Sequence, residues 1–208
     1  MRSEAVRHGF VAKEDGAALV EAALVMPILL LIMFGLMELG LYFWNASLAG
    51  KAVQLGVRRA IVSDAVAVGP GLDPAESEGY WDGLPPGLRC FPAPRETGPC
   101  PSFSVECDTV RRCDCTGGGC RFTFAAERLS PILQAMQAVM PSLRAENLRI
   151  GYATNGLGYV GRPVPVPVDV TVSLIGVTYR PILLGDLMGS LLPLHASARL
   201  PGEDLRAR

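Results

Sequence analysis

The feature that most constrains this chain is a long apolar run near its N-terminus. Over residues 17–44, a stretch of 28 residues, the only charged side chains are those of Glu21 and Glu38. A helix needs about 20 residues to cross the hydrocarbon core of a bilayer, so this run is long enough to span one. The aromatic residues 42–44 that close it have rings that favour the headgroup level of a membrane. The sequence therefore predicts one transmembrane helix.

The overall composition agrees with a membrane segment and gives no sign of nucleic-acid binding. Apolar residues make up 50% of the 208-residue chain, which is a large share for one small soluble domain to bury. The formal net charge is −1, so the chain lacks the basic surplus that phosphate binding needs. We expect a membrane partner and no nucleic acid.

The helical pattern continues past the apolar run to about residue 62. Spacings of three and four residues separate Leu48, Ala52, Leu55, Arg59 and Val62. A helix over 17–62 would be about 70 Å long, roughly twice what a bilayer requires, and would form a stalk beyond it. The helix contains four glycines, Gly35, Gly40, Gly50 and Gly56. Such small residues let neighbouring helices approach closely, and the alternative is that lipid simply tolerates them. Pro27 should kink the helix or leave a carbonyl without its amide donor.

All six cysteines lie in one Gly- and Pro-rich stretch, the loop region 90–120. They are Cys90, Cys100, Cys107, Cys113, Cys115 and Cys120. This even, clustered number is typical of a disulfide framework outside the cytoplasm and predicts three bridges. Cys113 and Cys115 are too close to bridge each other, and the other pairings stay open. Zinc is the alternative, but the region has no CxxC pair and the histidines are distant in sequence, so we expect no metal.

The remainder of the chain predicts a small α+β domain. Residues 64–121 show little periodicity, which favours irregular, cross-linked structure, and 124–143 carry an apolar stripe at helical spacing. Strand patterns follow at 148–153, 168–179 and 192–200. The expected organisation is a leader at 1–16, a transmembrane and stalk helix at 17–62, and a domain at 63–208 with a helix, a short antiparallel sheet and the disulfide-rich loop.

A carboxylate at bilayer depth needs a partner, because an ionised side chain there costs about 2.5–3.5 kcal/mol on insertion scales. If the chain were cut after Gly16, Ala17 would carry a new cationic amine, and Glu21 would lie at the i+4 position on the same helix face. The two charges could neutralise each other within one chain or between neighbouring subunits. Gly16 and Ala17 are therefore candidate processing residues, and Glu21 is a candidate assembly residue.

This segment resembles a known signal. GAALVE, at 16–21, followed by an apolar helix is similar to the class III signal of type IV pilins and pseudopilins. The longer run EDGAALVEAALVMPILLLIMFGLMELG, together with VDVTVSLIGVTYRPIL and LLPLHASARLPGE nearer the C-terminus, resembles the TadE-like proteins of tight-adherence pilus systems. Ala22 departs from the pattern, because many major pilins have an aromatic residue after the glutamate.

The resemblance implies a minor pilin-like subunit, or pseudopilin, that supports pilus biogenesis and adhesion. A prepilin peptidase would remove residues 1–16 on the cytoplasmic side by cutting between Gly16 and Ala17. The helix would anchor the chain in the bacterial inner membrane as a single-pass protein whose C-terminal domain is periplasmic or extracellular. Its partners would be other pilin or pseudopilin subunits and the pilus assembly machinery.

Two other interpretations remain open at this stage. A secretory signal cleaved after Ala49 would release a soluble, exported, Cys-rich domain, but the apolar run is longer than the 7–15 residues typical of such a signal. An uncleaved single-span component of another secretion or envelope machine would use Glu21 and Glu38 as helix contacts. Glu38 lies about 100° round the helix from Glu21, and snorkelling towards the far interface is its simpler explanation. Equal numbers of basic residues flank the run, so their distribution does not indicate which end is cytoplasmic. We orient the chain by its cysteines, which place the C-terminal part outside the cytoplasm.

No enzyme and no cofactor is expected. Gly156, Gly158 and Gly161 spell GxGxxG, but RPVPVP follows where a phosphate-binding helix must begin, so a glycine-rich turn is the better interpretation. His195 is the one histidine beyond the apolar run, and we place it within the predicted strand 192–200. No GxSxG or acid-partner signature accompanies it.

Overall fold

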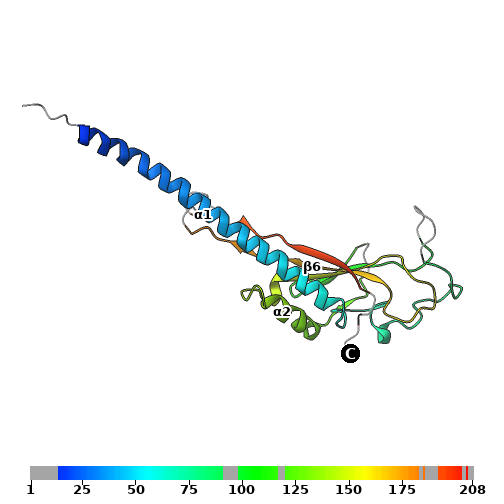
Figure 1. Cartoon of the computed structure of the whole chain (residues 1–208). Helices are drawn as coiled ribbons and strands as arrows, with labels where there is room; N and C mark the ends of the chain where they lie inside the picture. The colour runs from blue at the N-terminus through cyan, green and yellow to red at the C-terminus, as the bar shows by residue number, and fades with distance from the viewer. Residues whose placement is uncertain are drawn as a thin grey trace, which may run out of the picture.

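A long N-terminal helix lies with its second half on an antiparallel sheet, and its first half projects beyond the domain (Figure 1). The computed structural model describes residues 14–90, 98–116, 120–182, 185, 192–202 and 205, without the side chains of residues 14, 15 and 17. Helix α1, Glu14–Ala60, has 47 residues and continues through Pro27. Of the predicted leader, residues 1–13 lie outside the described residues and 14–16 form the start of α1.

The main sheet has five strands, and every neighbouring pair is antiparallel. In spatial order the strands are β3 Arg112–Cys115, β2 Ser104–Asp108, β5 Leu148–Thr154, β6 Val168–Leu174 and β9 Ser197–Gly202. Two short pairs accompany it: β1 Ala67–Val68 with β4 Thr123–Phe124, and β7 Thr178–Tyr179 with β8 Leu192–Pro193. Among the described residues, the domain has the helix α2 Ser130–Gln137 and the 3-10 turns η1 Pro74–Glu76, η2 Ala126–Leu129 and η3 Ala145–Asn147.

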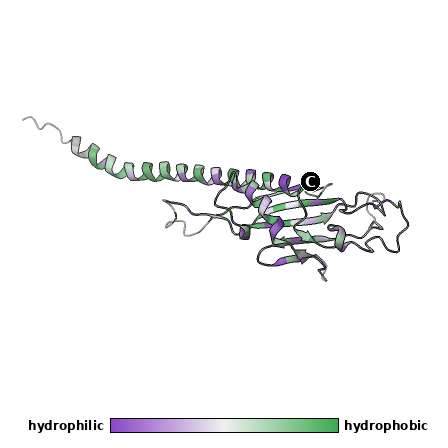
Figure 2. Cartoon of the chain, turned by 90° about the horizontal axis from the view of Figure 1, so that it is seen from below, coloured by the Kyte–Doolittle hydropathy of each residue, from purple (hydrophilic) through white to green (hydrophobic). Residues whose placement is uncertain are grey.

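One face of the sheet forms the core. Strand β6 alternates buried Val168, Val170, Val172 and Leu174 with half-buried polar residues, as its sequence predicts. The strand register places buried or half-buried side chains beside one another in rows, such as Val105, Tyr152, Val170 and Leu200. Helices α1 and α2 pack on this face and give the domain two layers (Figures 1 and 2). The α+β fold class is therefore confirmed.

The second half of α1 packs on its own domain and not as a free stalk. Its buried positions recur every three or four residues: Ala49, Ala52, Val53, Gly56, Val57 and Ala60. Because most of these residues are small, α1 approaches the sheet and α2 closely. A Cβ added at Gly56 would lie 2.6 Å from Met136 Sδ on α2. Leu55 and Val62, which marked the predicted helical spacing, are 37% and 52% exposed and lie off this buried stripe.

The helix predicted at 124–143 is present but shorter than expected. Residues 123–124 form β4, and the α-helix proper begins only at Ser130. Pro131 lacks an amide hydrogen, so a helix that began near 124 would lose a hydrogen bond at this position. Pro141 disfavours helical backbone at the residue before it, and α2 has already ended at Gln137.

The predicted strands are present, but two of them are interrupted. The strand expected at 168–179 divides into β6 and β7 around Gly176, whose φ of +66° an L side chain rarely adopts. The strand expected at 192–200 divides into β8 and β9. His195 therefore lies in an exposed connection and not within a strand, which corrects its predicted placement.

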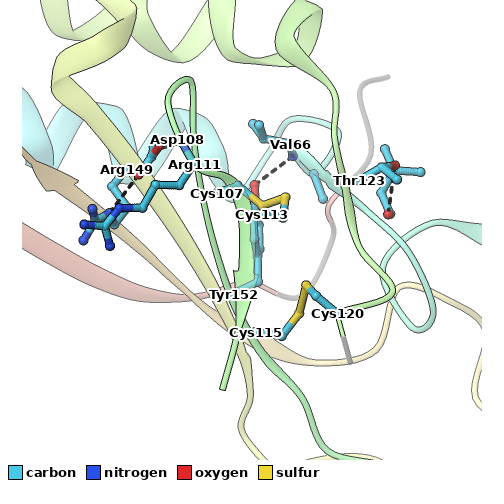
Figure 3. The surroundings of a disulfide bond; sticks show 12 residues. Val66, Cys107, Asp108, Arg111, Cys113, Cys115, Cys120, Thr123, Arg149 and Tyr152 are labelled. Carbon is cyan, nitrogen blue, oxygen red and sulfur yellow. Dashed lines mark hydrogen bonds and ion pairs between the residues drawn. A yellow bond between two sulfur atoms is a disulfide. The ribbon is translucent and has the colours of Figure 1, made fainter. Parts of the chain in front are cut away.

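Three disulfides cross-link the cysteine-rich region, which confirms the predicted number of bridges. They join Cys90 to Cys100, Cys107 to Cys113, and Cys115 to Cys120. The region is less irregular than predicted, because β2 and β3 form a hairpin in which Cys107 and Cys113 are cross-strand partners. Cys107 is 1% exposed and behaves as a core side chain. Figure 3 shows this bridge beside Tyr152.

Tyr152 connects the sheet to the chain that leaves α1. Its side chain is 1% exposed, and its hydroxyl oxygen accepts a hydrogen bond of 3.0 Å from the Val66 backbone amide (Figure 3). Burial raises the pKa of this hydroxyl well above its ordinary value, so the group stays neutral. The contact fixes the segment after α1 against the middle of β5.

Replacing Tyr152 with Phe should destabilise the domain by about 1–3 kcal/mol, because the buried Val66 amide loses its acceptor. Urea unfolding of the full-length chain in detergent, followed by near-UV circular dichroism, measures the change. The matched control is Tyr159→Phe, since Tyr159 is 50% exposed and its substitution should leave the unfolding midpoint unchanged. Equal midpoints for both variants would contradict a structural role for the Tyr152 hydroxyl.

Candidate anchoring and assembly site

The first half of α1 presents an apolar surface on all sides. Every described side chain between residues 18 and 37 is exposed, apart from half-buried Gly35. Leu19, Leu24 and Leu36 are 71%, 69% and 66% exposed. Figure 2 shows this apolar stretch of helix extending away from the domain. Within the described residues, α1 is the one helix that is long and apolar enough to cross a membrane. A continuous apolar surface of this extent indicates a lipid or protein environment.

The candidate processing residues lie in the first turn of α1. Beyond its chain neighbours and the local helix backbone, nothing lies within 4 Å of a Cβ added at Gly16, so the space beside this residue is open. Glu21 is one helical turn beyond Ala17, and its side chain is exposed. No described residue forms an ion pair with Glu21. The structure thus keeps these three positions together on one helix end, and the chemical roles assigned to them remain predictions.

Glu38 lies where the domain first meets α1. Its side chain is only 6% exposed, and one carboxylate oxygen accepts a hydrogen bond from the backbone amide of Ile182. The snorkelling expected for Glu38 is therefore wrong, because a segment of the same chain covers the carboxylate and donates to it. Ile182 is 144 residues away in sequence, and sequence reasoning did not identify this contact.

The segment around Ile182 makes further contacts with the same part of α1. We call it the β7–β8 arm, meaning residues 177–182 and 192–194. The Tyr179 and Tyr42 rings meet edge to face with their centroids 5.9 Å apart. A cavity of 240 Å³ between arm and helix is lined by Gly35, Glu38, Leu39, Tyr42, Tyr179, Pro181 and Leu192. The arm therefore covers one face of α1 inside the apolar run.

A charged network lies on the sheet face opposite the helices. The side chain of Asp108 is 4% exposed, and its carboxylate accepts hydrogen bonds from the backbone amides of Val110 and Arg111 at 2.9 Å and 2.6 Å. Arg149 Nε donates to it at 3.3 Å (Figure 3). Burial alone would raise the pKa of Asp108, but the two amides and the Arg149 guanidinium outweigh it and hold this pKa below its ordinary value.

Other features that could hold a ligand lie in the domain. A cleft of 640 Å³ beside the Cys115–Cys120 bridge is lined by polar and aromatic side chains, among them Tyr80, Phe103 and Phe122. Gly156, Gly158 and Gly161 all have positive φ and lie in the connection between β5 and β6, which is followed by no helix. Among the described residues, no group of three or more potential metal ligands is assembled.

These features define a protein with a single apolar N-terminal helix that carries an α+β domain. Comparison with known families is consistent with this class: residues 16–58 match the model of the family described as TadE-like protein. The N-terminal segment is therefore similar to this family, which confirms the resemblance over these residues. The match ends two residues before α1 does, so the resemblance suggested for the C-terminal strands stays a prediction. Curated proteins and solved structures gave no match.

The network around Asp108 predicts a specific pH dependence of stability. Because its pKa is lowered in the folded state, its contribution is fully present above the unfolded value, about 3.9, and is lost as the pH falls through the folded value. Asp108→Asn should cost about 1–3 kcal/mol at pH 7, and this difference from wild type should shrink below about pH 4.

Urea unfolding at pH 7 and at acidic pH measures both differences. Asp114→Asn is the control, because it neutralises an exposed carboxylate on the adjacent strand and should change stability little at either pH. A cost for Asp108→Asn that is the same at both pH values would show that the carboxylate charge does not stabilise the fold.

Proposed function

We propose that this chain is a minor pilin-like subunit of a tight-adherence pilus system, anchored in the bacterial inner membrane by α1. The observation that carries the proposal is the coincidence of the family match with a helix whose first half is exposed and apolar on every side. Exposing this apolar surface to water would cost free energy, whereas lipid or a bundle of similar helices provides a favourable environment for it.

The proposed division of the chain follows from this role. Residues 1–16 are a leader that prepilin peptidase removes, 17–62 are anchor and assembly helix, and 63–208 form the exported domain. The three disulfides support a domain that faces an oxidising compartment outside the cytoplasm. Cleavage after Gly16 would create the Ala17 amine one turn before Glu21, and this pair would replace lipid contact when the helix enters a bundle of pilin subunits.

The processed N-terminus tests the proposal directly. Intact mass and N-terminal sequencing of the chain extracted from membranes of its native host should give a start at Ala17. A start at Gly50 would instead identify a secretory signal cleaved after Ala49, and a start at Met1 would identify an uncleaved anchor. Either of these two results would overturn the proposed processing and, with it, the pairing of the new amine with Glu21.

Glu21→Gln should be cleaved normally but enter pili poorly. The substitution keeps the size of the side chain and removes the charge that would pair with the amine. Loss of an interaction of about 1.4 kcal/mol would reduce the fibre-associated fraction about tenfold. Immunoblots of sheared pili and membranes, made from cells that lack the wild-type chain, give this fraction.

Glu21→Asp is the matched control, because it keeps the carboxylate within reach of the Ala17 amine and should retain most incorporation. Membrane fractions also report cleavage of each variant by size. Wild-type amounts of the Gln variant in sheared pili would contradict the pairing of amine and carboxylate.

A further inference from the structure

We propose that the β7–β8 arm is a second membrane-contacting element, which lies in the lipid interface on the domain side of the bilayer and places Ile182 among the acyl chains. This inference rests on the anchoring role proposed for α1. It adds a lipid-contacting surface that is separate in sequence from the membrane helix.

The first argument is the level of Ile182 along α1. The hydrogen bond from its amide to Glu38 places Ile182 beside the turn that contains Glu38. At this level α1 exposes Leu36, Met37 and Leu39 to 66%, 61% and 50%. Ile182 is itself 78% exposed. A medium that surrounds the apolar side chains of this helical turn must therefore also surround Ile182.

The second argument is the thickness of the bilayer. From residue 17 to residue 37, a helix of 21 residues is about 31 Å long, close to the roughly 30 Å of a hydrocarbon core. The hydrocarbon would then end near Glu38, and residues 42–44 would lie about 6–9 Å further out, at the headgroups. Tyr179 meets Tyr42 at this second level, and exposed Arg180 follows Tyr179 in the chain. Aromatic rings and a guanidinium are favourable at the headgroup level.

The third argument is that backbone amides of the arm have hydrogen-bond partners within the protein. Non-helical backbone at membrane depth is tolerated where its polar groups are paired within the protein. The Ile182 amide donates to Glu38, and the Leu194 amide donates to the Val177 carbonyl at 2.9 Å. The same contact shields the Glu38 carboxylate from lipid. A shallow position at the edge of the hydrocarbon suits this pairing.

Lipid is a better occupant of the exposed Ile182 side than a second copy of the chain. The face of α1 marked by Gly35, Glu38 and Tyr42 is already covered by the arm, so helices of other subunits must pack elsewhere at this level. Ile182 lies beside the Glu38 turn, where α1 exposes apolar side chains, and exposed apolar side chains continue along α1 to Trp44. One medium can therefore cover both surfaces.

Photo-crosslinking in a defined bilayer tests the inference. In separate full-length chains, p-benzoylphenylalanine replaces Ile182, Leu24 or Leu157, and each chain is placed in vesicles of phosphatidylethanolamine and phosphatidylglycerol that contain a tritiated phospholipid. Leu24 reports the membrane helix. Leu157 is the control, since it is 54% exposed and lies in the β5–β6 connection at the opposite end of the sheet from the arm. A variant is scored as folded when its cysteines do not react with a thiol reagent in the absence of reductant.

We expect a lipid adduct at position 182 comparable with that at position 24, and none above the unirradiated sample at position 157. Labelling at 24 without labelling at 182 would overturn the arm's membrane contact and leave the anchor intact. An adduct between two copies through position 182, in place of lipid, would also overturn it and identify a subunit contact. Absence of labelling at both 182 and 24 would overturn the anchoring proposal together with this inference.

Discussion

The structure depends on the packing of one helix against two different environments. From Ala49 to Ala60, α1 buries a stripe of small residues on the sheet and on α2, whereas before Gly35 it buries nothing within the described chain. Because the helix is continuous between these parts, the domain is held at a fixed position and orientation on the apolar segment. The projecting half is therefore connected to the domain through the stripe that contains Gly56 and through the arm contacts at Glu38 and Tyr42. A bulky residue at Gly56 would meet Met136 and disturb this connection at its tightest point.

The domain itself combines a modest core with local cross-links. In the part of the chain that the structure describes, α1 and α2 lie on one face of its sheet, and the opposite face carries charged pairs such as Arg149 with Asp108 and Arg199 with Asp169. The three disulfides close short segments and not the long loops of the chain. The Cys90–Cys100 and Cys115–Cys120 bridges therefore restrain local segments, and the Cys107–Cys113 bridge joins two neighbouring strands of the sheet.

Sequence patterns predicted the parts of this structure that depend on local periodicity. The alternation of Val170 and Val172 with Thr171 and Ser173 predicted β6, and the apolar run predicted α1. The β2–β3 hairpin was missed because its inward positions include Cys107, which sequence reasoning treated as a cross-link and not also as a core residue. The contact between Glu38 and Ile182 had no local signal, since two residues 144 positions apart meet only through the path of the sheet.

The two acidic residues of the apolar run, Glu21 and Glu38, differ in whether the domain can supply a partner for the carboxylate. Glu38 is close enough to the domain for the arm to reach it, and a backbone amide of the same chain donates to its carboxylate. Glu21 is seventeen residues nearer the N-terminus, about 25 Å along the helix, and no described part of the domain extends so far. A counter-charge for Glu21 must then come from the end of the chain itself or from another molecule. This difference in reach is the physical reason why we propose an assembly role for Glu21 and not for Glu38, whose carboxylate already has a partner within the chain.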